Sequence, residues 1–221
     1  MCQFIETIRV ADGVFMNLKY HQKRMDDTMM YLGGKKISLE SFLHDQHVLD
    51  EFHKTDNGDV FRFSNEISGT TKNVLKVRVV YDKEGIKEVS VAPYTVRSIC
   101  SIKLVTCNSI DYSYKSVDRS KINELKEGAG DADEIIIVKN NLLTDTSYSN
   151  IALYDGVKWY TPKHPLLRGT MLQSLIDKGM LIERDIKAKD YFLYQKIALI
   201  NAMMPLGTCE VLIKGPSEGI G

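Results

Sequence analysis

Every uninterrupted apolar run in this 221-residue chain is short. The run Ile135–Val138 has the length of one β-strand, and no run approaches the roughly 18 apolar residues that cross a membrane. Residues typical of turns separate these runs. The pattern therefore predicts a protein built largely from short strands, without a membrane-spanning segment.

The first part of the chain alternates between strand-like and helix-like segments. Asp12–Gly13 is a hairpin signal between the first two strands, and Pro93 is expected to end the last one. We therefore expect residues 1–93 to form a small α+β domain, followed by a linker over 94–98. Strands are expected over 3–10, 14–18, 59–63, 74–81 and 86–92, and helices over 20–32 and 39–54.

Residues 99–221 contain many strand-like segments and few helix-like ones. This balance favours a larger, β-barrel-like domain over a doubly wound sheet. Neither a G-x-G-x-x-G stretch nor a Walker A motif occurs, which argues against a nucleotide site. Strands are expected over 101–107, 133–138, 149–154, 158–161, 181–187, 197–202 and 208–213, and helices over 118–127, 170–178 and 188–194.

The charge and cysteine content narrow the range of partners. Lysine plus arginine and aspartate plus glutamate are equal, at 29 each. Proteins that bind nucleic acid or membrane surfaces usually carry a basic excess, so we expect a small-molecule substrate, no nucleic acid and no membrane. The four cysteines have neither CxxC nor zinc-ligand spacing, so we expect free thiols and no metal. The N-terminus has no signal-peptide pattern, which favours a cytoplasmic protein.

Lys115 stands in a polar and aromatic stretch between an expected strand and an expected helix. Desolvation beside Tyr112 and Tyr114 would lower the pKa of its amine and leave it nucleophilic, as a lysine that bonds to a carbonyl compound requires. Taken alone, a lysine in such a place is most often a solvated surface residue.

Three further polar stretches each have a functional and a plain structural interpretation. The run Thr144–Ala152 leads into a strand and could be a simple turn, with Asp145 bonded to nearby backbone amides. Gly169–Thr170 opens a helix, which suits either a phosphate or an ordinary N-cap. Asn201–Leu206 follows an apolar strand and could be a strand end stopped by proline.

The order and spacing of six stretches resemble the class IV aminotransferases, which use pyridoxal 5′-phosphate (PLP). The stretches are Phe4–Arg9, His21–Met25, Tyr114–Arg119, Thr144–Ile151, Tyr160–Pro162 and Leu167–Met171. The resemblance implies a two-domain enzyme of PLP fold type IV, and it runs from residue 4 to about residue 213.

The resemblance also implies roles for individual residues. Lys115 corresponds to the lysine that bonds to the cofactor and moves the substrate's proton. Arg24 corresponds to the arginine on the cofactor phosphate, and Asp145 to the carboxylate that faces the pyridine nitrogen. The other expected cofactor-binding residues are Ser149 and Asn150 of the same stretch, Thr170 and Met171 at the phosphate, and Ala202 in the loop that starts at Asn201.

The sequence departs from the family pattern in three places. Asp145 stands where a longer glutamate is usual. The family's first hairpin, which helps to build the dimer, is not seen before Phe4, so a homodimer is expected with a smaller interface. Tyr81–Gly85 lacks the usual R-G, so Arg78, Arg97 or a partner subunit would have to bind the substrate carboxylate.

Within the family, Lys115–Arg119 and Asn201–Pro205 look closest to the 4-amino-4-deoxychorismate lyases. We therefore expect a PLP-dependent lyase that converts aminodeoxychorismate to 4-aminobenzoate and pyruvate. The alternatives are an aminotransferase of the branched-chain or D-amino acid type, and a family member that binds PLP or a partner without turnover.

Overall fold

The computed structural model describes residues 2–45, 48 and 74–215, which divide into two compact units, 1–95 and 96–221. Residues 94–101, at the boundary, form no regular element. The strand expected over 59–63 and most of the second half of the helix expected over 39–54 lie outside the described residues. No helix in the described parts is long and apolar enough to cross a membrane.

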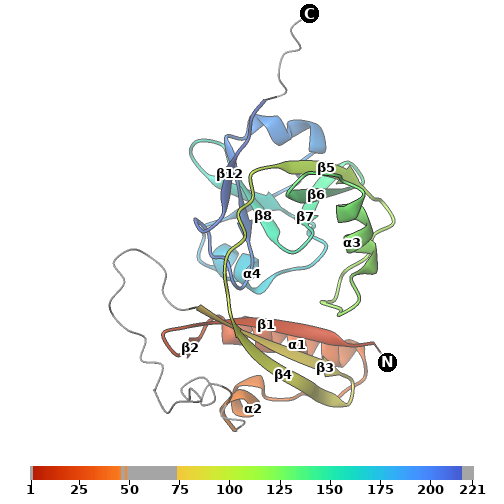
Figure 1. The fold of residues 1–221 in the computed structure, drawn as a ribbon, viewed down its shortest axis with the longest axis vertical. Coiled ribbons are helices and arrows are strands. Elements are labelled where there is room, and N and C mark those ends of the chain that lie inside the picture. Colours follow the sequence, from red (N-terminus) through yellow and green to blue (C-terminus); the bar gives the residue numbers. More distant parts are fainter. Residues whose placement is uncertain (1, 46–47, 49–73, 216–221) are drawn as a thin grey trace, which may run out of the picture. The chain divides into compact units, whose positions relative to one another are not determined.

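In its described residues, unit 1 consists of a four-stranded antiparallel sheet and two helices (Figure 1). The strands lie in the order β2-β1-β3-β4, and the Asp12–Gly13 hairpin is confirmed, with both residues at positive φ. The second strand is shorter than expected because Asn17, also at positive φ, turns the chain into the first helix. The elements are β1 (Phe4–Ala11), β2 (Val14–Phe15), α1 (Leu18–Tyr31), α2 (Leu39–Asp45), β3 (Val74–Asp82) and β4 (Gly85–Pro93).

The core of unit 1 forms between α1 and one face of the sheet. Alternate residues of β1 are buried, as a half-buried strand requires, and Met25 and Met29 of α1 are almost fully buried. Glu6 falls on the buried face of β1 with no exposed surface. A carboxylate in that position has to be paired, because an unpaired buried charge is very costly.

The part of unit 2 that the structure describes, up to residue 215, contains two sheets and three short helices (Figure 1). One sheet has the order β5-β6-β7 and the other β10-β9-β8-β11-β12. Its elements are β5 (Ile102–Thr106), α3 (Ser120–Glu127), β6 (Glu134–Lys139), β7 (Leu142–Thr146), β8 (Asn150–Tyr154), β9 (Trp159–Pro162), α4 (Thr170–Asp177), β10 (Ile182–Arg184), the 3-10 helix η2 (Ala188–Leu193), β11 (Lys196–Ile200) and β12 (Glu210–Leu212).

The expected barrel is not found: in the described residues, the strands of unit 2 form two separate open sheets. The chain passes from β5 through α3 into β6, which pairs with β5 in parallel, and a parallel pair requires a crossover connection of this kind. Apolar residues of α3 and β6 form one core cluster, and residues of α4, β8 and β11 form another. Mixed α and β content, expected from the sequence, is confirmed.

Strand β7 was not expected. Asn140 and Asn141 both adopt left-handed backbone conformations, and they form a tight turn that pairs Lys139 with Leu142. The pairing places the polar residues Thr144–Thr146 inside the unit. The segment that looked like a turn is therefore the second strand of a hairpin, and Asp145 lies near its end.

Candidate active site

Among the described acidic residues of unit 2, Asp145 has the pKa that departs most from its ordinary value. Its side chain is buried, with 6% of the residue exposed. Oδ2 accepts the backbone N–H of Leu167 at 2.9 Å, and Oδ1 accepts the side-chain amide of Asn150 at 2.8 Å. Burial raises the pKa of Asp145 to about 7, although these hydrogen bonds and the charge of Lys115 lower it. Near neutral pH this carboxyl is poised between its two protonation states.

Asn150 joins Asp145 to the start of α4. Its amide nitrogen also donates to the carbonyl of Leu167 at 2.8 Å. A β-carbon on Gly169 would lie 2.1 Å from Asn150 Oδ1, so only glycine allows this close approach. One amide side chain thus fixes β7, β8 and the loop before α4 against one another.

The turn between β7 and β8 is held by its own hydroxyl groups. Thr146 Oγ1 lies 2.8 Å from Ser149 Oγ and accepts the Ser149 N–H at 3.0 Å. Ser149, expected to bind the cofactor, is buried here with its hydroxyl directed at Thr146. The turn is therefore held rigidly next to Asp145.

Lys115 lies in the connection between β5 and α3 and is half-buried. The helix begins at Ser120, two residues later than expected, so Lys115 belongs to an irregular segment. The hydroxyl of Tyr112 donates to the carbonyl of Ser116 at 2.8 Å and closes this segment around the lysine. Lys115 is close enough to Asp145 for its charge to lower the pKa of that carboxyl.

The N-terminus of α4 follows directly from the Asn150 contact. Gly169 is the N-cap and makes no side-chain cap, and Thr170 and Met171 after it are buried. The first N–H groups of a helix have no acceptor within the helix, and its positive dipole end favours an anion. The start of α4 can therefore bind a phosphate.

Ala202 lies in the loop after β11, next to the turn between β7 and β8. Asn201 Oδ1 accepts the N–H groups of Met203 at 2.9 Å and Met204 at 3.0 Å, which shapes the loop. The amide nitrogen of Asn201 is 3.5 Å from the carbonyl of Tyr148. The guanidinium of Arg97 lies 5.9 Å from the ring centre of the same tyrosine.

Unit 2 contains every expected site residue except Arg24, and the contacts described above link Lys115 and Asn150 to Asp145. The expected site residues in unit 2 are Lys115, Asp145, Ser149, Asn150, Thr170, Met171 and Ala202.

Arg24 lies in unit 1, where it pairs with the buried Glu6. Arg24 Nε donates to Glu6 Oε1 at 2.9 Å and Nη2 donates to Oε2 at 2.5 Å, while His21 Nδ1 lies 2.6 Å from Oε2. Although burial raises the pKa of Glu6, Arg24 and His21 bring it down to about 2. The two-point contact fixes the plane of the guanidinium group.

Replacing Glu6 should strongly destabilise the protein. Glu6→Gln keeps the size but leaves the Arg24 charge without its partner, and breaking a buried pair in this way costs about 3–5 kcal/mol. Since the pKa of Glu6 is about 2 in the folded protein and 4.5 ordinarily, its contribution is complete above pH 4.5 and is lost as the pH falls towards 2. Urea unfolding at pH 7 and at pH 3 measures both effects.

The matched control is Glu88→Gln on β4. Glu88 pairs with Arg78 at 3.6 Å, but its side chain is 61% exposed, so the change should be below about 1 kcal/mol. Equal free energies of unfolding for the two variants would show that the buried pair adds nothing.

The sequence matches the model of a protein family over most of its length. The model of the family "Amino-transferase class IV" matches residues 3–209. The chain belongs to the class IV aminotransferases. An uncharacterised protein of Haemophilus influenzae is 30% identical over 203 residues, which cover 92% of this chain and 98% of the relative.

The fold of this chain is similar to those of solved structures whose names include an aminotransferase and a lyase. A protein of Haemophilus somnus, provisionally named a 4-amino-4-deoxychorismate lyase, is 27% identical with a TM-score of 0.79, covering 93% of this chain and 98% of its own. A hypothetical aminotransferase of Mycobacterium tuberculosis in a PLP-bound form shares the fold, with 18% identity, a TM-score of 0.70 and coverage of 96% and 80%. This class IV aminotransferase is therefore a PLP-dependent enzyme.

Sequence reasoning missed some residues that build the site. Gly169 and Leu167 were quoted only as parts of a motif, yet they carry the contacts to Asn150 and Asp145. Glu134 accepts two hydrogen bonds from Ser147, next to the candidate site, but a single glutamate at the start of an apolar strand gives no signal in the sequence. The pairing of Glu6 with Arg24 could have been suspected only from their shared motif order.

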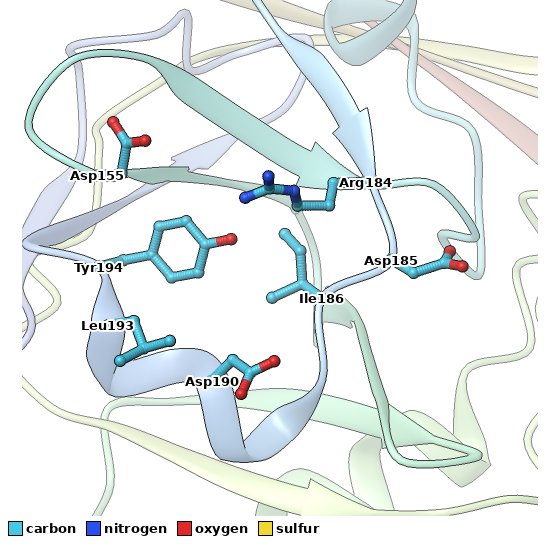
Figure 2. Close-up of a pocket in the computed structure, with 7 residues that line it drawn as sticks. All are labelled: Asp155, Arg184, Asp185, Ile186, Asp190, Leu193 and Tyr194. Atoms are coloured by element: carbon cyan, nitrogen blue, oxygen red, sulfur yellow. The ribbon is translucent and has the colours of Figure 1, made fainter.

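A separate hollow lies at the other end of β8 (Figure 2). Asn150 begins this strand, whereas Asp155, which lines the hollow, directly follows its last residue. Arg184 lies over the ring of Tyr160 at 4.5 Å, and in Figure 2 it extends towards Tyr194. None of the expected site residues lines this hollow.

Proposed function

We propose that the chain is a PLP-dependent lyase that converts 4-amino-4-deoxychorismate to 4-aminobenzoate and pyruvate. The observation that carries the proposal is the half-buried Lys115 within electrostatic reach of the buried Asp145. The structural similarity to the Haemophilus somnus protein supports the choice of reaction. The product 4-aminobenzoate places the proposed reaction in folate biosynthesis, and we propose a cytoplasmic homodimer.

The site residues fit PLP. Although the charge of Lys115 lowers the pKa of Asp145, burial leaves this carboxyl with a pKa near 7. The protonated nitrogen of a pyridine ring would supply a positive partner in direct contact with it. The start of α4 suits the phosphate, and Lys115 provides the amine that PLP requires.

The residues would divide the work as follows. PLP, when bound, supplies an electron sink for the negative charge that develops on the substrate. Asp145 would hold a proton on the ring nitrogen, and the N–H groups of Thr170 and Met171, with the Thr170 hydroxyl, would bind the phosphate. Lys115 Nζ would hold the cofactor through its amine and would take and return the substrate's proton. Ser149, Asn150 and Ala202 complete the cofactor site.

Arg24 is proposed as a further phosphate ligand. Glu6 already holds Nε and one edge of the guanidinium, which would limit its motion and lower the entropy lost on binding phosphate. Arg97, beside Tyr148, is a candidate for the substrate carboxylate.

Arg24→Lys should weaken PLP binding more than it changes kcat at saturating PLP. The variant keeps the charge but loses the planar fork, and a charge-assisted hydrogen bond contributes about 1.5–3 kcal/mol, or roughly a tenfold to hundredfold change in Kd. Titration of the apoenzyme with PLP measures this. Lys23→Met, which removes an exposed cation from the same helix, is the control and should bind PLP as the natural protein does. Equal Kd values for all three proteins would exclude Arg24 from the phosphate site.

The competing reaction is amino-acid transamination. A structure from Mesorhizobium loti provisionally named an amino-acid aminotransferase covers 96% of this chain, with a TM-score of 0.67 and 15% identity, so the fold alone permits both reactions. The pure holoenzyme should release 4-aminobenzoate and pyruvate in equal amounts from aminodeoxychorismate. Turnover only with an amino donor and 2-oxoglutarate would support the aminotransferase. Sedimentation of the holoenzyme tests the dimer.

A further inference from the structure

We propose that Arg119 is a positioning residue, which holds the Lys115 segment at a fixed distance from Asp145 through a hydrogen-bonded bracket made of Arg119, Ser147 and Glu134. This inference rests on the proposed function, because it concerns the same lysine and carboxylate. It assigns a role to two charged residues that the mechanism above does not use.

The bracket is a chain of direct hydrogen bonds. Arg119 Nη2 donates to the carbonyl oxygen of Ser147. On its other side, Ser147 donates its backbone N–H to Glu134 Oε1 at 3.1 Å and its hydroxyl to Oε2 at 3.0 Å. Ser147 is therefore held from both sides, by a guanidinium group and by a carboxylate.

Glu134 has no exposed surface, and its burial calls for an explanation. Removing a carboxylate from water costs several kcal/mol unless donors satisfy it. In the described residues no lysine, arginine or histidine forms an ion pair with it, and its donors are Ser147 and its own neighbour Ile135, whose N–H lies 2.8 Å from Oε1. Apart from the N–H of the adjacent Ile135, the donors to Glu134 both belong to one turn residue, Ser147.

The bracket joins two segments that carry the chemistry. Arg119 is four residues after Lys115, and Ser147 is two residues after Asp145. The Lys115 segment is irregular, so its position depends on ties to other elements. Lys139 Nζ binds the carbonyl of Ile110 at 2.6 Å before the lysine, and the Arg119 bond to Ser147 anchors the segment after it.

The distance between the two groups matters because of the shape of PLP. The aldehyde carbon and the ring nitrogen lie at opposite ends of one rigid ring, so Lys115 and Asp145 have to be spaced to suit it. A displacement of about 1 Å in such a site can cost on the order of 10²-fold in rate. A tie that fixes this spacing acts on kcat rather than on the affinity for substrate.

The test compares Arg119→Met and Arg119→Lys with the natural holoenzyme. Arg119→Met should lower kcat, per bound PLP, on the order of 10²-fold with little change in KM. It should also shift the midpoint of the pH titration of the cofactor's visible absorption, because the surroundings of Lys115 have changed. Arg119→Lys keeps a donor for the Ser147 carbonyl and should restore part of kcat and of the midpoint.

Two further variants test the Ser147 contact and provide a control. Ser147→Ala removes the hydroxyl bond to Glu134 while leaving both backbone contacts, and should change both readouts in the same direction but less. Lys121→Met removes an exposed cation that pairs with Glu124 at 2.9 Å near the start of the same helix, and should match the natural enzyme.

The outcomes separate this inference from the proposed function. If Arg119→Met binds PLP and keeps the natural kcat and titration midpoint, the bracket has no positioning role. A lower thermal stability with unchanged kcat per bound PLP would equally overturn it, because it would show a purely structural role. If the natural protein fails to form a covalent PLP adduct on Lys115, the proposed function itself is wrong.

Discussion

Lys115→Ala should lose both turnover and covalent attachment of PLP. The natural protein, reduced with borohydride after loading with PLP, should carry a phosphopyridoxyl label on Lys115, identified by peptide mass spectrometry. The variant should carry none there. Because the proposed role of this lysine is both to bind the cofactor and to move the proton, the loss of kcat should be on the order of 10⁴-fold or more.

A matched control separates the role of this lysine from a general loss of charge. Lys121→Ala lies on the same stretch of chain, in an exposed ion pair, and should keep both the label and the activity. A label on another lysine of the natural protein, or activity retained in Lys115→Ala, would contradict the central assignment.

Asp145→Asn should bind PLP on Lys115 but turn over slowly. The amide keeps the size of the side chain but removes the charge that holds a proton on the ring nitrogen. Preorganised electrostatic groups of this kind are worth about 10²–10³ in kcat. Single-turnover kinetics with a substrate deuterated at the transferred position would show whether the proton-transfer step has slowed. Full activity in an assay limited by chemistry would make Asp145 only a structural residue.

The apoenzyme offers an independent readout of the same carboxyl. Because burial raises the pKa of Asp145 to about 7 from the ordinary 3.8, the folded state binds the proton more tightly than the unfolded state. Stability should therefore fall as the pH rises from about 4 to 7, by roughly 4 kcal/mol in total. Asp145→Asn should flatten that part of the urea-unfolding profile.

Asp145→Glu tests whether the aspartate is merely a tolerated substitute for the usual glutamate. Both carboxylate oxygens already accept hydrogen bonds from fixed donors, Leu167 N–H and the Asn150 amide. A longer side chain would move the carboxylate away from these donors in a site with little free surface. We therefore expect the activity of Asp145→Glu to fall, and natural activity would show that the site can accommodate the longer acid.

Much of the secondary structure could be predicted, because apolar periodicity is a local property. Strand β7 was missed because only its first two residues are apolar, whereas Thr144, Asp145 and Thr146 are polar. Thr144 and Asp145 are buried only because partners elsewhere satisfy them, as when Thr144 Oγ1 donates to the carbonyl of Ile137 at 2.7 Å. The two open sheets of unit 2 could not be predicted either, since strand order depends on contacts between distant segments.

The candidate site could be predicted only for residues that lie in the six stretches shared with the family. Motif order named Lys115, Asp145 and Arg24, but not the residues that hold them in place. Glu134, for example, looks like any charged residue before a strand, and only the fold brings it to Ser147. A residue that matters only through one contact with a distant part of the chain cannot be identified from one sequence.

The pairing of β1 with β3 determines when the sheet of unit 1 can form during folding. Phe4 pairs with Tyr81, so the first strand of the chain cannot complete its ladder until β3 has left the ribosome. The β1–β2 and β3–β4 hairpins close over short distances, whereas joining them requires a long loop to close, which is slow. Until that step, Glu6 lacks the sheet that buries it, and the acid–base pair with Arg24 remains open to water.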